Sequence, residues 1–316
     1  MRALLSLLVL LAACAGPAPD VSGGVCSLDR RAVLPVAVVQ NVPLVGVLIN
    51  GQPATMVLDT GANLTMLTQT AARRLGLVPE EGVAVETVSA GGAGVAGAAR
   101  IGGLLLGGTE LPGRLVGVVP ISLPSWAGGR VDGLLGTDVL ADYDVELDLP
   151  NGTVTLYRAR PCLDALPPWP VPFQTLERRE ASPGTLFVPV WLDGVGLTAL
   201  LDTGTSLTVV TPRVAWAAGV PGEVLARAPV LQGVTPGPNS LTTRAVRFRE
   251  LRLGDEAWRG PVLLVGPLPP SAGDGLLGGD YLASRRVWLS FATGQVFVAR
   301  PRLDASGPAA PLDPAR

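Results

Sequence analysis

Short apolar runs separated by turn residues dominate the chain, and one arrangement of them occurs twice. In the first half, the runs Leu44–Leu48 and Thr55–Leu58 flank a turn at Asn50-Gly51. Two apolar runs joined by Asn-Gly predict a β-hairpin with a tight turn. The same order returns in the second half, with Leu186–Leu192, Asp193-Gly194 and Leu197–Leu201. Each predicted hairpin ends directly before an Asp-Thr-Gly triplet.

A short apolar segment and then a helix are predicted after each triplet. The first helix is expected over Gln69–Leu75, with Gly76 ending it. The second has Thr211 as its N-cap and Pro212 at its first position, and it ends at Gly219. A polar N-cap, an early proline and a following glycine are the usual signals of helix ends. The 40 glycines and 30 prolines of the 316-residue chain favour short strands over long helices.

A second repeated motif indicates that a whole unit is duplicated. Asp-Gly-Leu-Leu-Gly occurs within Val131–Gly136 and again within Gly273–Gly278. The triplets are 202 − 59 = 143 residues apart and the longer motifs 274 − 132 = 142 apart, which predicts two fused lobes rather than a short repeat. We expect an N-terminal extension at 15–41, lobes at 42–160 and 174–301, a Pro-rich linker at 161–173 and a flexible tail at 302–316.

Composition and charge limit the chemistry that the chain can perform. Apolar residues make up 48 % of it and charged residues 16 %, which indicates a folded globular protein. A formal net charge of −2 and the lack of a clustered basic patch argue against nucleic-acid binding. The chain contains no histidine, which excludes Ser-His, Cys-His and His-ligated metal mechanisms. Carboxylates are left as the titrating groups near neutral pH.

The N-terminus has the pattern of an export signal. Met1-Arg2 precedes the apolar run Ala3–Ala13, which is shorter than the roughly 20 residues of a membrane-spanning helix. Leu11–Cys14 also resembles a bacterial lipobox, which would make Cys14 the lipidated first residue of the mature protein. Ordinary cleavage after nearby small residues is the alternative. Both interpretations of segment 1–14 predict an exported protein of the periplasm or cell envelope, and the lipobox adds an anchor to a membrane.

Two other cysteines, Cys26 and Cys162, remain after export. In an oxidising compartment an isolated pair is more often a disulfide than two free thiols, so we expect these two to be bonded. The bridge would tie the N-terminal extension to the segment between the lobes. Two cysteines without any histidine argue against a metal site.

The duplicated motifs together resemble the aspartic-protease superfamily, in a bilobal pepsin-like arrangement of two bacterial retropepsin-like domains. The resemblance covers Val42 to Pro301 and includes the elements Leu104–Gly107 and Leu251–Gly254. A single Asp-Thr-Gly is weak support. Here each copy is followed by an Asp-Gly-Leu-Leu-Gly motif, after 132 − 59 = 73 and 274 − 202 = 72 residues. The resemblance implies an all-β fold with two homologous β-barrel-like lobes and short helices.

The resemblance assigns catalysis to Asp59 and Asp202. Two facing carboxylates cannot both ionise comfortably, so one becomes the acid and the other the base that activates water. The alternative is that both are turn residues or caps at strand ends, which are common roles for aspartate. The duplication within apolar strands favours the catalytic interpretation.

Five residues are expected to support the two carboxylates: Thr60, Gly61, Thr203, Gly204 and Thr205. By resemblance, the threonines of the two triplets would interlock across the lobe interface, and the glycines would let backbone amides approach the carboxylates. The Thr205 hydroxyl would hydrogen-bond Asp202, whereas Ala62, at the equivalent position, offers no such group to Asp59. The two carboxylates are therefore expected to have unequal surroundings.

Two further pairs of aspartates recur in the duplicated lobes. Asp132 and Asp274 precede Gly-Leu-Leu-Gly and form a rival dyad, but the resemblance assigns this motif to a buried structural strand. Asp138 and Asp280 are interpreted as N-caps of short helices. We therefore expect all four to be structural.

The Gly-rich stretch Val88–Ala98 is the predicted flap of the first lobe, with Ser89, Gly91 and Gly92 as substrate-binding residues. Such a hairpin would close over an extended substrate and exclude water. A merely flexible surface loop is the alternative. Val230–Thr242 is the counterpart in the second lobe, and neither stretch contains the tyrosine that pepsin-like enzymes carry on the first-lobe flap.

The predicted function is that of an aspartic endopeptidase that hydrolyses peptide bonds in extended polypeptides. Backbone pairing in a cleft between two sheet-rich lobes would supply affinity, and no metal or organic cofactor is required. We expect a monomer, because one chain supplies both aspartates. Three alternatives are a non-hydrolytic peptide-binding envelope lipoprotein with the same fold, a processing protease with one native target, and a structural envelope protein.

Overall fold

The structure is a computed structural model. It describes residues 27–90, 92–121, 123, 129–160, 166–176, 184–235 and 240–300. The predicted signal segment and tail lie outside these ranges, as do Cys14, Cys26, Cys162 and Gly91. The lipid anchor and the disulfide therefore remain predictions from the sequence.

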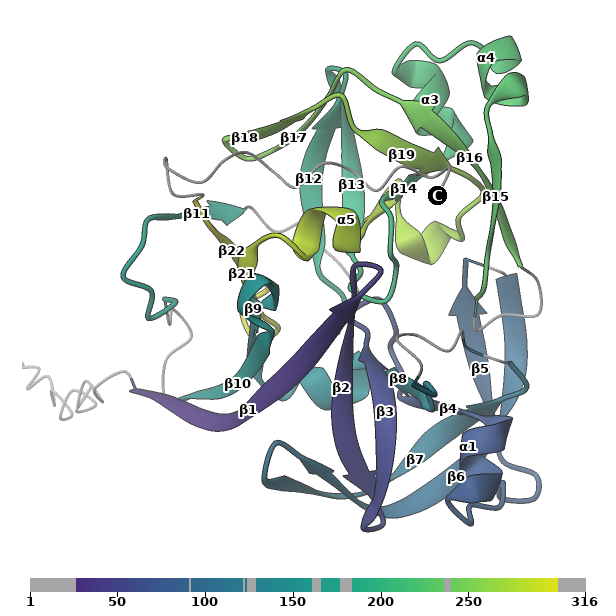
Figure 1. Ribbon diagram of the computed structural model, residues 1–316, viewed down its shortest axis with the longest axis vertical. Helices are drawn as coiled ribbons and strands as arrows, with labels where there is room; N and C mark the ends of the chain where they lie inside the picture. The colour runs from purple at the N-terminus through teal and green to yellow at the C-terminus, as the bar shows by residue number, and fades with distance from the viewer. Residues whose placement is uncertain are drawn as a thin grey trace, which may run out of the picture.

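Strands make up most of the first half of the chain (Figure 1). They are β1 Ser27–Val39, β2 Val42–Ile49, β3 Gln52–Leu58, β4 Met66–Thr68, β5 Ala84–Ser89, β6 Gly92–Leu106, β7 Thr109–Val119, β8 Gly133–Leu135, β9 Asp144–Asp148 and β10 Thr153–Arg160. The helical segments between them are short: α1 Gln69–Arg74, α2 Thr137–Leu140 and the 3-10 turn η1 Leu149–Asn151.

The second half is also built mainly of strands. They are β11 Phe173–Leu176, β12 Phe187–Leu192, β13 Val195–Leu201, β14 Val209–Val210, β15 Val230–Gly233, β16 Leu241–Arg247, β17 Glu250–Leu253, β18 Glu256–Arg259, β19 Val262–Val265, β20 Gly275–Leu277, β21 Arg286–Ser290 and β22 Val296–Ala299. Its helical segments are α3 Pro212–Ala217, α4 Gly222–Arg227, η2 Pro270–Ala272 and α5 Gly279–Leu282.

Both predicted hairpins are confirmed. β2 pairs antiparallel with β3, and β12 pairs antiparallel with β13. The turn residues Asn50 and Gly51 have φ of 50° and 77°, and Asp193 and Gly194 have φ of 50° and 88°. A two-residue turn with both residues at positive φ matches the right-handed twist of the strands, and asparagine, aspartate and glycine tolerate that conformation best.

The Leu-Leu-Gly motif forms a buried strand in each lobe. In the first lobe, β8 lies parallel to β3 on one side and antiparallel to β4 on the other. In the second lobe, β20 lies in the same way between β13 and β14. Gly133 opens β8, and a Cβ there would overlap the backbone carbonyl of Met66. This confirms the structural interpretation of the motif.

A central sheet joins the two halves, in the order β11-β22-β21-β9-β10-β1. Its middle pair is β9 from the first half and β21 from the second, antiparallel from Asp144↔Ser290 to Asp148↔Arg286. Figure 1 shows this central sheet at the left, with β2–β8 below as the first lobe and β12–β20 above as the second lobe. Strand β1 lies inside the predicted extension 15–41, so strand pairing begins before the predicted lobe boundary.

The linker between the lobes packs against the central sheet. Trp169 is buried, and its Nε1 donates to the carboxylate of Glu146 on β9 at 2.7 Å. Glu146 also accepts from the Tyr157 hydroxyl at 3.0 Å and from Nε of Arg286 at 2.6 Å. A buried carboxylate is costly unless it is paired and hydrogen-bonded. The described part of the predicted linker, residues 166–173, is therefore held against the central sheet through Trp169.

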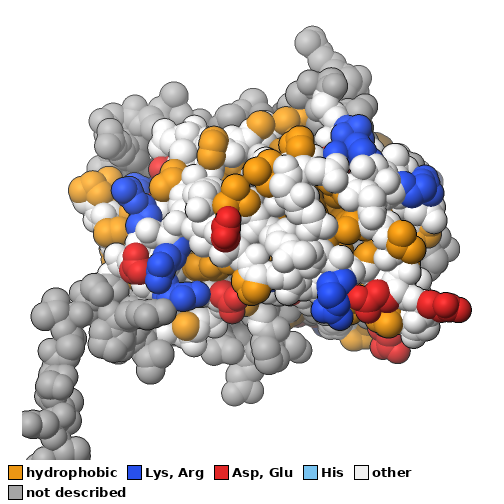
Figure 2. All heavy atoms as spheres, turned by 90° about the horizontal axis from the view of Figure 1, so that it is seen from below, with side chains coloured by type: hydrophobic (Ala, Val, Ile, Leu, Met, Phe, Trp, Pro, Cys, Tyr) orange, Lys and Arg blue, Asp and Glu red, His pale blue; other side chains and the backbone are white. Residues whose placement is uncertain are grey.

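The surface carries charges of both signs. Figure 2 shows the face at the end of the first lobe, where Arg side chains alternate with Asp and Glu side chains. This interspersed pattern agrees with the small formal net charge of −2. Among the residues described, no helix is long and apolar enough to cross a membrane.

Candidate active site

The two predicted catalytic aspartates meet between the lobes. Asp59 directly follows β3 and Asp202 directly follows β13, and their amides donate to Leu135 at 3.0 Å and Leu277 at 3.1 Å. The Leu-Leu-Gly strands β8 and β20 thus fix the positions at which the chain leaves β3 and β13. Asp59 is buried and Asp202 is half-buried, and the two carboxyl groups are hydrogen-bonded to each other. The structure brings together two residues that are 143 positions apart.

Each triplet glycine faces the carboxylate of the opposite lobe. A Cβ at Gly61 would lie 2.6 Å from Cγ of Asp202, and a Cβ at Gly204 would overlap the carboxylate of Asp59. Both positions therefore require glycine for close approach. The glycine amides serve their own lobe: Gly61 donates to Oδ1 of Asp59 at 2.9 Å, and Gly204 donates to Oδ1 of Asp202 at 2.8 Å.

The triplet threonines interlock across the lobe interface, as the resemblance implied. The Thr60 amide donates to the Thr203 hydroxyl oxygen, and the Thr203 amide donates to the Thr60 hydroxyl oxygen, both at 3.1 Å. Each hydroxyl in turn donates to a carbonyl of the other lobe, Thr60 to Leu201 at 2.7 Å and Thr203 to Leu58 at 2.6 Å. Both threonines are buried, so these bonds fix the two strand ends relative to each other.

The two carboxylates differ in how easily they lose a proton. Burial raises the pKa of Asp59, and amide hydrogen bonds from Gly61 and Ala62 partly offset this rise. Burial also raises the pKa of Asp202, and the negative charge of Asp59 raises it further above its ordinary value. The amides of Gly204 and Thr205 lower this pKa, but they offset only part of the rise. The two carboxyl groups therefore titrate as a coupled pair, and Asp202 is the one whose pKa a neighbouring charge raises further.

Thr205 reduces this difference through its backbone. Its amide lowers the pKa of Asp202, and its methyl carbon would lie 2.8 Å from a Cβ at Gly278. Among the hydrogen bonds of the described residues, none joins the Thr205 hydroxyl to Asp202. The predicted inequality between the two aspartates holds, but it comes from burial and from the charge of Asp59.

Asp138 and Asp280 are not the N-caps that the sequence predicted. The N-caps of α2 and α5 are Gly136 and Gly278. The Asp138 carboxylate instead accepts from the Thr65 amide at 2.8 Å and from the Thr65 hydroxyl at 2.7 Å. The prediction failed because the partner lies 73 residues away, where a local capping pattern gives no signal.

The second lobe has the same arrangement, in which the amide and the hydroxyl of one threonine both donate to one aspartate; we call it a clamp. The Thr208 amide and hydroxyl donate to Asp280 at 2.9 and 2.7 Å, and the Thr208 hydroxyl oxygen accepts from the Gly278 amide at 3.1 Å. Sequence reasoning missed both threonines, although each follows the aspartate of an Asp-Thr-Gly triplet by six residues (65 − 59 and 208 − 202). Burial raises the pKa of Asp280 to about 6. These clamps hold the loops that carry the dyad.

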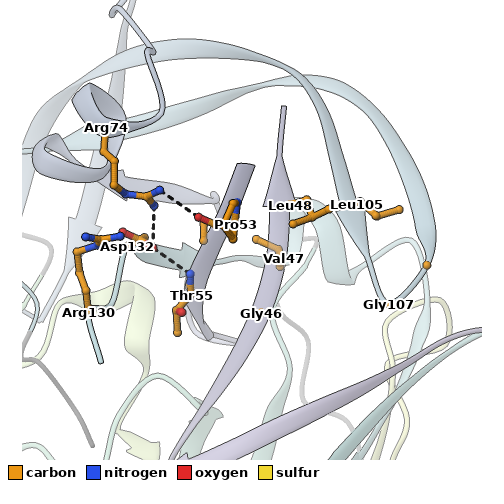
Figure 3. A pocket seen from close by; sticks show the side chains of 12 residues that line it. Gly46, Val47, Leu48, Pro53, Thr55, Arg74, Leu105, Gly107, Arg130 and Asp132 are labelled. Carbon is orange, nitrogen blue, oxygen red and sulfur yellow. Dashed lines mark hydrogen bonds and ion pairs between the residues drawn. The ribbon is translucent and has the colours of Figure 1, made fainter. Parts of the chain in front are cut away.

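The rival dyad of Asp132 and Asp274 is structural. Asp132 accepts from the Thr55 amide at 3.0 Å and pairs with Arg74 at 3.0 Å and Arg130 at 2.8 Å. Figure 3 shows these groups at a hollow of about 640 Å³ beside the β2–β3 hairpin, and neither Asp59 nor Asp202 lines it. Although burial acts the other way, these partners hold the pKa of Asp132 below its ordinary value.

Asp274 has the equivalent surroundings in the second lobe. Its carboxylate accepts from the Thr198 amide at 3.1 Å and pairs with Arg213. Each of the two carboxylates therefore ties a strand to arginine side chains within its own lobe, Asp132 to two arginines and Asp274 to one. This arrangement serves packing and leaves neither group free to act on a substrate.

The predicted flap is a hairpin whose strands are longer than the sequence indicated. β5 pairs with β6 from Ala84↔Gly97 to Ser89↔Gly92, and the predicted residue Gly91 between them lies outside the described residues. Its counterpart pairs β15 with β16. β5 and β15 are the outermost strands of their sheets, and Figure 1 shows them on the same side of the molecule.

Two sheet-rich lobes that bring one Asp-Thr-Gly loop each to a shared interface define a bilobal aspartic protease fold. The sequence matches the family described as Aspartyl protease over residues 45–139 and 188–281. These matches cover one segment of each lobe and more than half of the chain, so the protein belongs to this family. No curated protein matches the sequence.

Proposed function

We propose that the protein is an aspartic endopeptidase that hydrolyses peptide bonds in extended polypeptides. The observation that carries the proposal is the hydrogen-bonded pair of Asp59 and Asp202, of which only Asp202 has its pKa raised by a neighbouring charge as well as by burial. A pair of carboxyl groups that shares one proton supplies a base and an acid at the same point. Hydrolysis of an amide needs both.

The proton transfers follow from this inequality. Asp59 takes a proton from water as the water oxygen bonds to the scissile carbonyl carbon. Asp202 gives its proton to the carbonyl oxygen, which produces a tetrahedral diol. The carbon–nitrogen bond then breaks, the leaving nitrogen receives the proton held by Asp59, and a diol hydroxyl returns a proton to Asp202. The dyad ends in its starting state, so one water is consumed for each bond cleaved.

Extended peptide is the substrate class that fits the edges of the two sheets. β5 and β15 are edge strands, and an extended chain can pair with such edges through its backbone. Ser89 and Gly92 lie on the β5–β6 hairpin, which we propose as the flap. One chain carries both aspartates, so the proposed active form is a monomer.

We further propose that the protein is exported to the periplasm or cell envelope and anchored to a membrane through Cys14. The supporting features are the apolar run Ala3–Ala13 and the lipobox-like Leu11–Cys14. Export would also allow Cys26 and Cys162 to pair. Replacing Cys14 by serine should move the protein from the membrane fraction to the soluble fraction. If wild type is itself soluble, the anchor is disproved.

A peptide-library cleavage assay over about pH 3 to 7 tests the enzymatic proposal. Wild type is compared with Asp59→Asn and Asp202→Asn, each of which keeps the side-chain volume and removes one carboxylate. We expect cleavage by wild type and none by either variant. Full activity in either asparagine variant would exclude the dyad. Peptide binding by wild type without cleavage at any pH would favour the alternative, a non-hydrolytic peptide-binding lipoprotein.

A further inference from the structure

The turn between β1 and β2 reaches from the first half onto the active loop of the second lobe. Its residues Gln40 and Asn41 have φ of 48° and 68°. The Asn41 side-chain amide donates to the backbone carbonyl of Ser206 at 3.3 Å. Ser206 lies in the loop that begins at Asp202, so this bond joins the first half of the chain to the loop that carries Asp202.

This turn packs against Gly279, the first residue of α5. A Cβ at Gly279 would overlap the backbone carbonyl of Asn41, and it would also lie 2.9 Å from the Asn41 Cβ. No larger residue fits at position 279 while the turn stays where it is. The Gly279 amide donates to the carbonyl of Thr205 at 2.8 Å, and the Asp280 amide donates to that of Ser206 at 3.0 Å. The turn, α5 and the active loop are therefore one packed unit.

At the equivalent place on the other side of the interface, the glycine and the residue with a side chain are exchanged. The duplication offsets relate Asn41 to Gly184 (184 − 41 = 143) and Gly279 to Thr137 (279 − 137 = 142). A Cβ at Gly184 would lie 3.0 Å from Oγ1 of Thr137. Here the residue on the turn is glycine and the residue on the helix has the side chain. Only the loop of the second lobe receives a side-chain hydrogen bond from an asparagine at this place.

We propose that Asn41 is a positioning residue for Asp202 and acts through Ser206 and Thr205 across the lobe interface. Gly279, which we call the socket, leaves the space that the Asn41 backbone occupies. Removing the Asn41 amide frees the Ser206 carbonyl from one of its two donors. Adding a Cβ at position 279 displaces either the turn or α5, and with α5 the loop that carries Asp202. The equivalent change in the first lobe has no such effect, because position 137 already carries a side chain.

Stability measurements on the full chain test the socket without reference to catalysis. Gly279→Ala should lower the thermal unfolding midpoint by several degrees, whereas Gly222→Ala, at the first position of α4 where an added Cβ meets nothing within 4 Å, should leave the midpoint near that of wild type. Adding Asn41→Gly to Gly279→Ala should recover part of the loss, because glycine lets the turn withdraw. A wild-type midpoint for Gly279→Ala, or equal losses for the two alanine variants, would overturn the socket.

Cleavage kinetics test the positioning role, which rests on the proposed function. Asn41→Asp keeps the size and the positive φ but replaces the donor by an acceptor, and it should lower kcat by about tenfold or more with KM nearly unchanged. The exposed neighbour variant Gln40→Gly is the matched control and should cleave as wild type does. An Asn41→Asp variant with wild-type kcat would overturn the proposal.

The pH profile separates positioning from a general loss of structure. The charged group that faces Asp202 is Asp59, and the Thr205 amide lowers the pKa of Asp202. If Asn41→Gly loosens that amide, the alkaline limb of the kcat profile moves to higher pH. An unchanged limb together with a lowered kcat would contradict this role for Asn41. If wild type cleaves nothing, the proposed function fails, and the stability comparison still decides the socket.

Discussion

Thr60 and Thr203 exchange hydrogen bonds in a closed pair, with each backbone amide donating to the other hydroxyl oxygen at 3.1 Å. Each hydroxyl also donates to a carbonyl on the opposite lobe. The two residues are buried, so all of these groups lack access to water. The two Asp-Thr-Gly loops are thus joined at the residues that directly follow Asp59 and Asp202.

Thr203→Val should destabilise the protein strongly, although its shape is nearly unchanged. The Thr60 amide and the Leu58 carbonyl would each lose a buried partner, at a cost of about 1–3 kcal/mol per group. Thr203→Ser keeps the hydroxyl and loses only a methyl group, which costs about 1 kcal/mol. Urea unfolding measures both. Equal losses for the two variants would show that the hydroxyl is unimportant.

Gly61→Ala should abolish cleavage. The added Cβ would lie 2.6 Å from Cγ of Asp202 and would push the two carboxylates apart. Gly46→Ala is a suitable control, since a Cβ at Gly46 in β2 meets nothing within 4 Å. We expect wild-type kcat/KM for Gly46→Ala and no detectable turnover for Gly61→Ala. Turnover by the second variant would mean that the dyad tolerates separation.

Asp202→Asn should stabilise the protein at pH 7 while it removes activity. Because the pKa of Asp202 is raised in the folded state, stability from this group is present at low pH and is lost as the pH rises through that pKa. Asparagine carries no charge and avoids this loss. The gain in unfolding free energy should shrink as the pH falls toward about 4. A pH-independent difference would contradict the raised pKa.

Asp132→Asn should have the opposite effect on stability and leave the chemistry intact. The pKa of Asp132 is lowered in the folded state, so its contribution is present above the unfolded pKa and is lost as the pH falls through the folded pKa. The variant should be less stable than wild type at pH 7 and should still cleave peptides. Complete loss of cleavage in folded Asp132→Asn would revive the rival dyad.

Thr208→Val, which removes the second-lobe clamp, should lower the free energy of unfolding more at pH 7 than at pH 4. The Thr208 hydroxyl favours the charged form of Asp280, so its removal should lift the pKa of Asp280 above its value of about 6. Stability from that proton is fully present below the unfolded pKa and is lost as the pH rises through the folded pKa. Thr65→Val is the matched variant in the first lobe. It should show a smaller pH dependence, because Arg114 lies beside Asp138 and helps to keep it charged.

The sequence predicted best where function or turn geometry restricts the choice of residue. Asn50-Gly51 marked a hairpin because few residues accept two positive φ angles. Thr211 and Pro212 marked the start of α3, where the Thr211 side chain accepts from the Val214 amide. The two triplets identified the dyad because their surroundings repeat. In each case the signal lies within a few residues of the feature that it predicts.

Contacts between distant parts of the chain could not be predicted in this way. Asp138 looked like a helix cap, but its carboxylate turns back to Thr65. Asn41 gave no sign of its bond to Ser206, 165 residues away. The prolines of the linker identified it, but they gave no sign that Trp169 donates a hydrogen bond to Glu146. These pairings depend on how the lobes face each other, which local patterns do not encode.

Because of the central sheet, the two halves do not depend on the peptide connection between them to stay together. Strands β9 and β21 exchange main-chain hydrogen bonds across the middle of that sheet, so the halves cohere through backbone pairing as well as through side chains. A single cut in the connection after folding should leave two fragments associated. The connection acts earlier, by giving each half an effective concentration of about millimolar for the other while the sheet assembles.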